Sequence, residues 1–281
     1  MYESSQSFQP YQKSETKKTL LSEKRILHCI IIRSVRCITK HEVDKLVSDV
    51  CVHNFLWKFL STLHSALSDK DAHLMTSVER YYIGLSVMKE CSGFCIERTK
   101  STLPSGGRGV SVTDGVVPKH HVTSLYPGLL YQPYDPVFFQ SIGNHFIFRC
   151  IDGILIDGND KGLSKSLYKS CMRRDSLWPL PACDESWLTD LPVCPLNVGQ
   201  YVNNQNKKYP ANVAYQEFSL PEDFPAHLRQ YLPINFYSSI LNVPENMHRP
   251  VKIVALISLD KIHCSQELFS SYFTLVSSHD K

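Results

Sequence analysis

A glycine-rich loop ahead of a strand-like run is the first feature that could do chemistry. Gly106, Gly107 and Gly109 surround Arg108, and an alternating apolar run follows at 110–112. Glycine adopts positive φ and allows close backbone approach, so such a loop can cradle an anionic or zwitterionic ligand. No Gly-Lys-Ser/Thr follows, which argues against a nucleotide-phosphate loop. Taken alone, the loop fits a flexible connector equally well.

A second group of polar residues lies in the last third of the chain. Asn203 and Asn204 follow an aromatic and an apolar residue, Asn212 comes shortly after, and Glu267 precedes Tyr272 by five positions. Each has an ordinary structural explanation, because Asn is common in turns and Tyr272 is one of 14 tyrosines. The place of Asn203 after a strand-like step and before Asn212 favours a functional site instead.

Together these motifs resemble those of SET-domain methyltransferases. The matching segments, in the family's order, are Gly107-Arg108-Gly109, Tyr126-Pro127-Gly128, Gly199-Gln200-Tyr201-Val202-Asn203-Asn204 with Ala211-Asn212-Val213, and Glu267-Leu268-Phe269-Ser270-Ser271-Tyr272. The resemblance covers roughly residues 101–276.

The resemblance implies S-adenosylmethionine as the cofactor and methyl transfer to a lysine amine of a protein or peptide. The residues that it assigns to the cofactor are Gly107, Arg108, Gly109, Asn203, Asn204 and Tyr272. Tyr272 is also the implied catalytic residue, orienting the amine beside the methyl group. Because lysine has a pKa of about 10.4 and is mostly a cation, the site must favour the neutral amine and hold it in line.

Two departures from the family pattern leave an alternative open. Asn204 stands where the family has His, and no Cys follows Tyr272 in the sequence, whereas family members often close the lysine channel with a Cys-rich segment. The cover is therefore expected from Phe273, from an insert at 159–197 or from the N-terminal helices. The alternative function is a SET-fold interaction module with weak or no catalysis.

The elements that position these residues predict an α+β protein. A helical N-terminal region at 39–97 precedes a SET β-fold at 98–276, which the resemblance describes as small curved sheets with a threaded, knot-like C-terminal segment. Residues 1–38 show no clear pattern and are compatible with disorder, and 277–281 form a tail.

Helical spacing marks the N-terminal region. Thr39 and Glu42 form a capping-box pattern, and apolar residues then recur at helical intervals to Leu67, as one long helix or two in series. Ser68 and Asp69 break this pattern and could cap a second helix, which carries Leu74 and ends near Gly93.

Short strand-like runs dominate after Ser101. Asp114 and Gly115 predict a turn between two of them, and Asp152 and Gly153 predict a hairpin between the runs at 146–150 and 154–156. Further strands are predicted at 122–126, 213–218 and 251–257, and the 159–197 insert is predicted to be loop-rich.

Composition excludes several other classes. A balance of 30 basic against 27 acidic residues gives no basic surface for direct nucleic-acid binding. The apolar run at 26–32 is far shorter than the ~20 residues of a membrane span, so no membrane association is predicted. Ten irregularly spaced cysteines behind a polar N-terminus predict free thiols in an intracellular protein, nuclear or cytoplasmic. Cys91 and Cys95 have no partner pair at zinc-ligand spacing, so no metal is predicted.

Overall fold

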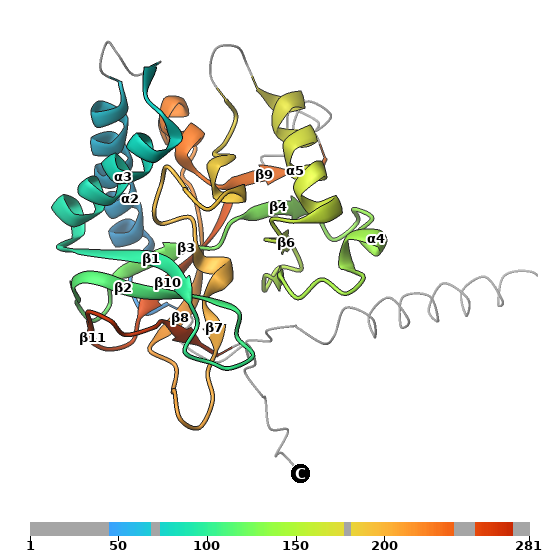
Figure 1. The fold of residues 1–281 in the computed structure, drawn as a ribbon. Coiled ribbons are helices and arrows are strands. Elements are labelled where there is room, and N and C mark those ends of the chain that lie inside the picture. Colours follow the sequence, from blue (N-terminus) through green and yellow to red (C-terminus); the bar gives the residue numbers. More distant parts are fainter. Residues whose placement is uncertain (1–44, 69–73, 177–180, 239–250, 272–281) are drawn as a thin grey trace, which may run out of the picture.

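The computed structural model describes residues 45–68, 74–176, 181–238 and 251–271 (Figure 1). The predicted capping box at Thr39 and Glu42, and the residues Tyr272 and Phe273, lie outside these ranges. The described chain is an α+β protein of helices and small sheets, as predicted. No described helix combines the length and the apolar character that crossing a bilayer requires.

Two helices form the N-terminal part of the described chain, α2 (Asp49–Leu67) and α3 (Ser77–Ser92). α2 is one helix, which begins where the Ser48 hydroxyl accepts a hydrogen bond from the Cys51 amide. Its buried residues recur at helical spacing: Val52, Leu56, Phe59, Leu60, Leu63 and Leu67. α3 opens with a capping box of Thr76 and Glu79 and ends at Gly93, whose φ is 77°. The predicted end of this helix is confirmed, but the predicted cap at Ser68 is wrong, because Ser68 ends α2 and Thr76 caps α3.

The strands form four small sheets. The first contains β1 (Phe94–Lys100), β2 (Arg108–Val117) and β11 (Ile262–His263), and the second contains β3 (Val122–Leu125), β10 (Lys252–Ser258) and β8 (Val213–Ser219). The third contains β5 (Ile147–Arg149), β6 (Leu155–Asp157), β4 (Gly128–Tyr131) and β9 (Ile234–Phe236), and the fourth pairs β12 (Phe269–Ser270) with β7 (Asn203–Asn204). The hairpin predicted at Asp152 and Gly153 joins β5 to β6 in antiparallel register.

The turn predicted at Asp114 and Gly115 is wrong. Both residues lie within β2, which pairs with β1 across a bulge between Cys95 and Ile96. Gly115 has a φ of 75°, and a Cβ there would collide with the Gly93 carbonyl oxygen. The Asp-Gly step therefore accommodates the bulge and lets the strand continue.

The insert at 159–197 contains a helix that the sequence analysis missed. α5 (Gly162–Asp175) lies against β4 and β9, on the far side of the molecule from α2 and α3 (Figure 1). The rest of the described part of the insert is loop with the short 3-10 helix η3 (Ser186–Leu188), and the absence of strands from this described part agrees with the prediction. Tyr168 of α5 and Trp187 of η3 contact edge to face in a small second core.

The main core joins the helices to the sheets. Buried residues of α2 belong to the same cluster as those of β10, the central strand of the second sheet, in which Ile253, Val254 and Leu256 have no exposed surface. α3 packs on β1 and β2, and α2 packs on the 3-10 helix η5 (Ala226–Tyr231). The helices thus share one core with the sheets that carry the candidate site, and the predicted boundary at residues 97 and 98 falls inside β1.

Candidate functional site

A cavity of about 460 Å³ lies between the glycine loop and the strand β5. Gly107, Arg108 and Asn203 line one part of it, and aromatic residues line the other: Tyr126, Phe146, Phe148, Tyr201 and Tyr215. The structure therefore brings three of the predicted cofactor residues to one cavity, although Asn203 lies about a hundred residues after Gly107 and Arg108 in the chain.

The glycines of the loop have different structural roles. Gly107 has a φ of 59°, and a Cβ built there would meet nothing within 4 Å, so its backbone is open to the cavity that it lines. Gly109 is buried at the start of β2, where a Cβ would collide with the Glu267 carboxylate. Gly107 thus leaves room for a ligand, and Gly109 leaves room for a side chain of the protein.

Glu267 fixes Asn203 beside this loop. The Asn203 Nδ2 donates to Glu267 Oε1 at 3.1 Å and to the Arg108 carbonyl oxygen at 3.0 Å. Glu267 also accepts hydrogen bonds of 2.7 Å from the Ser101 hydroxyl and from the amide and hydroxyl of Thr102. Burial raises the pKa of Glu267, but these hydrogen bonds outweigh it and hold the pKa below its usual value. The carboxylate is therefore charged at neutral pH, and the orientation of the Asn203 amide is set.

The two C-terminal motifs lie side by side. β7 and β12 pair in parallel, with Phe269 opposite Asn203 and Ser270 opposite Asn204. Asn212 fastens the same segment, because its side chain donates to the Glu267 carbonyl oxygen and accepts from the Phe269 amide, at 2.9 and 2.8 Å. The structure brings Asn203 and Asn204 next to residues 269–270, and Tyr272 lies just beyond the described chain.

Aromatic side chains close the other part of the cavity. The rings of Tyr126, Phe148 and Tyr215 contact one another, with centroid distances of 5.0 to 6.1 Å. The Tyr126 hydroxyl donates to the Phe146 carbonyl oxygen at 2.7 Å, and the Tyr215 hydroxyl accepts from Ser270 at 3.1 Å. Sequence reasoning noted Tyr126 only as part of a motif and missed Phe148 and Tyr215, which carry no local signal for a site.

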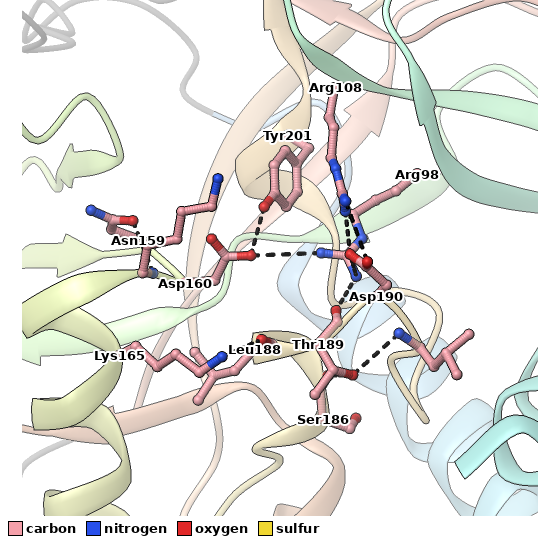
Figure 2. A network of polar contacts seen from close by, with 12 residues as sticks. Arg98, Arg108, Asn159, Asp160, Lys165, Ser186, Leu188, Thr189, Asp190 and Tyr201 are labelled. Carbon is pink, nitrogen blue, oxygen red and sulfur yellow. Dashed lines mark hydrogen bonds and ion pairs between the residues drawn. The ribbon is translucent and has the colours of Figure 1, made fainter.

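A polar network joins the insert to the glycine loop (Figure 2). Arg108 forms a two-point ion pair with Asp190 of the insert. The guanidinium of Arg98 on β1 donates to the Thr189 carbonyl oxygen and lies 3.8 Å from Asp160. Arg98 on β1 and Arg108 on the loop therefore both hold the insert.

Tyr201 belongs to both the network and the cavity. Its hydroxyl donates to Asp160 Oδ2 at 2.6 Å, and the Arg98 guanidinium lies 5.1 Å from its ring centroid, a cation–π contact. Burial, with the hydrogen bond to Asp160, raises its pKa to about 12, so the hydroxyl stays protonated. Lys161 lines the cavity beside this network. The insert thus forms part of the cavity wall, one of the three sources of cover that the sequence suggested.

One cysteine and two carboxylates form a candidate cation cluster in the described part of the chain. The ligand atoms of Cys150, Asp152 and Glu217 lie within 4.8 Å of one another. Lys252 Nζ lies 2.8 Å from Asp152 and 3.6 Å from Glu217, so an ammonium already balances these carboxylates. Cys91 and Cys95 are not part of the cluster.

Comparisons with known proteins give two close sequence relatives. No family model matches the chain. SET domain-containing protein 9 of Pongo abelii is 52% identical over 272 residues, which cover 87% of this chain and 97% of that protein. SET domain-containing protein 9 of Homo sapiens is 41% identical over 273 residues, which cover 87% of this chain and 89% of that protein.

Two solved structures show weaker similarity. The crystal structure of CpSET8 from Cryptosporidium matches 92% of this chain and 94% of its own, at 12% identity and a TM-score of 0.34. The structure of ctPRC2 in an autoinhibited conformation bound to S-adenosylmethionine matches 66% of this chain and 16% of its own, at 11% identity and the same TM-score. A TM-score of 0.34 is too low to support a fold assignment, which therefore depends on the two sequence relatives.

Proposed function

The chain belongs to the family of SET domain-containing protein 9, and on this premise we propose that it is an S-adenosylmethionine-dependent protein-lysine methyltransferase. One observation carries the proposal. Glu267 fixes Asn203 against the glycine loop at the polar part of a cavity whose other part is aromatic. A polar part suits the amino-acid group of the cofactor, and an aromatic part suits the alkyl chain and amine of a lysine.

The residues present fit this cofactor. We propose that Gly107, Arg108, Gly109, Asn203 and Asn204 hold it, through the open backbone at Gly107 and the fixed amide of Asn203. When bound, S-adenosylmethionine would supply the methyl group: the lysine nitrogen lone pair forms the new N–C bond, and the electron pair of the broken C–S bond stays on the sulfur. The Arg108 guanidinium, paired with Asp190, would attract the cofactor's carboxylate.

The chain's own residues prepare the amine. Tyr126, Phe148 and Tyr215 exclude water from their part of the cavity, which disfavours the charged lysine and lowers its pKa. The proton leaves for solvent before transfer. We propose that Tyr272 then orients the neutral amine, which lets positioning lower the barrier.

A pair of glycine substitutions tests the cofactor site. Gly107 and Gly143 have φ values of 59° and 64°, and a Cβ at either would meet nothing within 4 Å. Replacing either by Ala therefore has a similar backbone cost of about 1–2 kcal/mol. Only Gly107 lines the cavity, so Gly107→Ala should weaken S-adenosylmethionine binding at least tenfold in calorimetry, and Gly143→Ala should leave it unchanged. If the wild-type protein does not bind S-adenosylmethionine at millimolar concentration, the proposal is wrong.

Radiolabelled transfer to a peptide array tests the reaction itself. We expect label on lysine peptides, and Tyr272→Phe should melt as wild type does and lose on the order of 10²-fold in rate. Binding of the cofactor without transfer to any protein or peptide would instead favour the interaction module, consistent with Asn204 where the family has His.

We further propose the features that accompany this function. The helical region ends at Gly93 and the SET domain extends from β1 to residue 276, with the C-terminal segment threaded as a knot-like element. The protein acts on a lysine-bearing protein, without direct nucleic-acid or membrane binding, in the nucleus or cytoplasm. Localisation of a fluorescent fusion, with and without the 1–38 segment, tests the last point.

A further inference from the structure

Gln200 has a buried side-chain amide that no hydrogen bond of the described chain satisfies. It lies in the 3-10 helix η4 (Gly199–Tyr201), is 4% exposed and lines the cavity. Neither its Oε1 nor its Nε2 has a hydrogen-bond partner among the described residues. Buried amides are nearly always paired, so an unpaired one in a cavity indicates a partner from outside the described residues.

The other polar groups of the cavity differ from Gln200 in this respect. The hydroxyls of Tyr126, Tyr201 and Tyr215 are each engaged with protein atoms. The Asn203 Nδ2 is directed to Arg108 and Glu267. Gln200 is the one cavity-lining residue of the described chain whose buried polar atoms have no partner.

The position of Gln200 indicates which part of a ligand it meets. A Cβ at Gly158 would lie 2.9 Å from Tyr126 Cε1 and 3.3 Å from Gln200 Cβ, so Gln200 borders the aromatic part of the cavity. There the rings of Tyr126, Phe148 and Tyr215 contact one another and form an apolar wall, and the hydroxyls of the two tyrosines are bonded to protein atoms. The amide oxygen of Gln200 is the acceptor that an N–H at this place requires.

We propose that Gln200 is an amine-binding residue, whose Oε1 accepts a hydrogen bond from the ε-amine of the target lysine. The inference rests on the proposed function and names a residue for its substrate. An unmodified neutral amine keeps two N–H bonds, a monomethylated amine keeps one and a dimethylated amine keeps none. Gln200 therefore holds the unmodified and monomethylated amines and favours transfer to them.

Two substitutions separate this role from a structural one. Gln200→Met keeps the length and removes both hydrogen-bonding groups, and Gln200→Glu keeps an acceptor but adds charge. Because Gln200→Met buries no unpaired amide, its melting temperature should equal or exceed that of wild type. Gln230→Met is the matched control, since Gln230 lies on η5 outside the cavity.

The experiment uses a lysine peptide from the array and the same peptide with norleucine, which lacks the amine. Wild type should bind the lysine peptide more tightly, and Gln200→Met should lose about tenfold of that preference while its affinities for norleucine peptide and S-adenosylmethionine stay within twofold. Gln200→Glu should shift the pH–rate profile to higher pH, because a carboxylate stabilises the ammonium form. Gln230→Met should match wild type throughout.

The outcomes are distinguishable. A Gln200→Met variant with the wild-type preference for the lysine peptide overturns the inference alone. A variant that loses affinity for the cofactor and keeps the lysine preference assigns the amide to the cofactor, which also overturns it. Wild-type protein that does not bind S-adenosylmethionine overturns the proposed function and this inference together.

Discussion

Glu267 connects three separate segments of the chain through one buried carboxylate. Its oxygens accept from Ser101 and Thr102, which follow β1, and from Asn203 on β7. The missing Cβ of Gly109 on β2 makes the room that the carboxylate occupies. Because each of these partners is a donor, the site depends on an acceptor with two equivalent oxygens.

Replacing Glu267 by Gln should therefore destabilise the protein although the shape is kept. The new NH₂ group faces a donor, and we expect a loss of about 1–3 kcal/mol in the free energy of unfolding. The folded-state pKa of Glu267 lies below its usual 4.5, so its stabilising effect is present above about pH 4.5 and is lost as the pH falls through the folded pKa.

Urea unfolding of both proteins between pH 3 and 7 measures this effect. The difference between wild type and Glu267→Gln should be largest at neutral pH and shrink in acid. Gln266→Glu, at an exposed neighbour, serves as the control for a change of charge alone. A constant difference across the whole range would contradict the assignment.

For single residues, the sequence motifs predicted which residues lie near the site, but not what each of them contacts. The motif order placed Gly107 and Asn203 in one site, and both line the cavity. It gave no hint that Gly109 faces Glu267, or that Gln200 is buried without a partner, because both facts arise from segments that are distant in the chain.

Among the elements, α5 shows why a helix can escape sequence analysis. Its buried positions are Ser164, Tyr168, Cys171 and Met172, which have helical spacing but include a hydroxyl and a thiol. Lys161 at its N-cap makes no side-chain capping bond, so no start signal marks the helix. The helix is stabilised by packing on β4 and β9, which only the fold supplies.

Asp184 joins two parts of this insert through its side chain and gives the insert a pH response. Its carboxylate accepts from the Ser186 amide and hydroxyl and from the Asn197 side chain. Burial raises its pKa from 3.8 to about 6, so the folded chain keeps a proton that the unfolded chain releases. The contribution of Asp184 to stability should therefore fall as the pH rises from about 4 to about 6 and then level off.

The substitution Asp184→Asn removes this titration. The stability of wild type relative to the variant should decrease over the same pH window, as measured by urea unfolding at pH 4 to 7. Asp223→Asn, at an exposed carboxyl, should show no such trend. A difference that rises with pH would show that Asp184 is charged in the folded chain throughout.

At the scale of the whole molecule, α2, α3 and the sheets share the main hydrophobic core. Leu60 of α2 has no exposed surface and belongs to the same cluster as the central strand β10. Leu60→Ala should therefore lower the free energy of unfolding by about 2–5 kcal/mol and shift the entire transition. Val50→Ala, on the same helix but 65% exposed, should change it by no more than about 0.5 kcal/mol.

Circular dichroism and fluorescence, followed together in urea, check this prediction. Both signals should shift to the same lower midpoint in Leu60→Ala. If the helical signal moved alone, the helices would form an independent unit.

The fold class and most elements could be predicted because their signals are local. The apolar stripe of α2, the Gly93 stop and the Asp152-Gly153 hairpin all depend on neighbours within a few residues. The order of strands could not be predicted from spacing, since β10 lies between β3 and β8, far from both in sequence. The Asp114-Gly115 error has the same origin: partner strand β1 converts a turn signal into a bulge.

The short parallel pairing of β7 with β12 has a consequence for synthesis on the ribosome. Every described residue that lines the cavity lies before residue 216, so translation delivers all of these early. Glu267 and β12, which fix Asn203, are among the last described residues to emerge. A product of premature termination near residue 260 would carry these lining residues without the carboxylate that orders Asn203. On the proposed function, we expect such a fragment to bind S-adenosylmethionine more weakly than the finished chain, so that the order of translation delays cofactor binding until the protein is nearly complete.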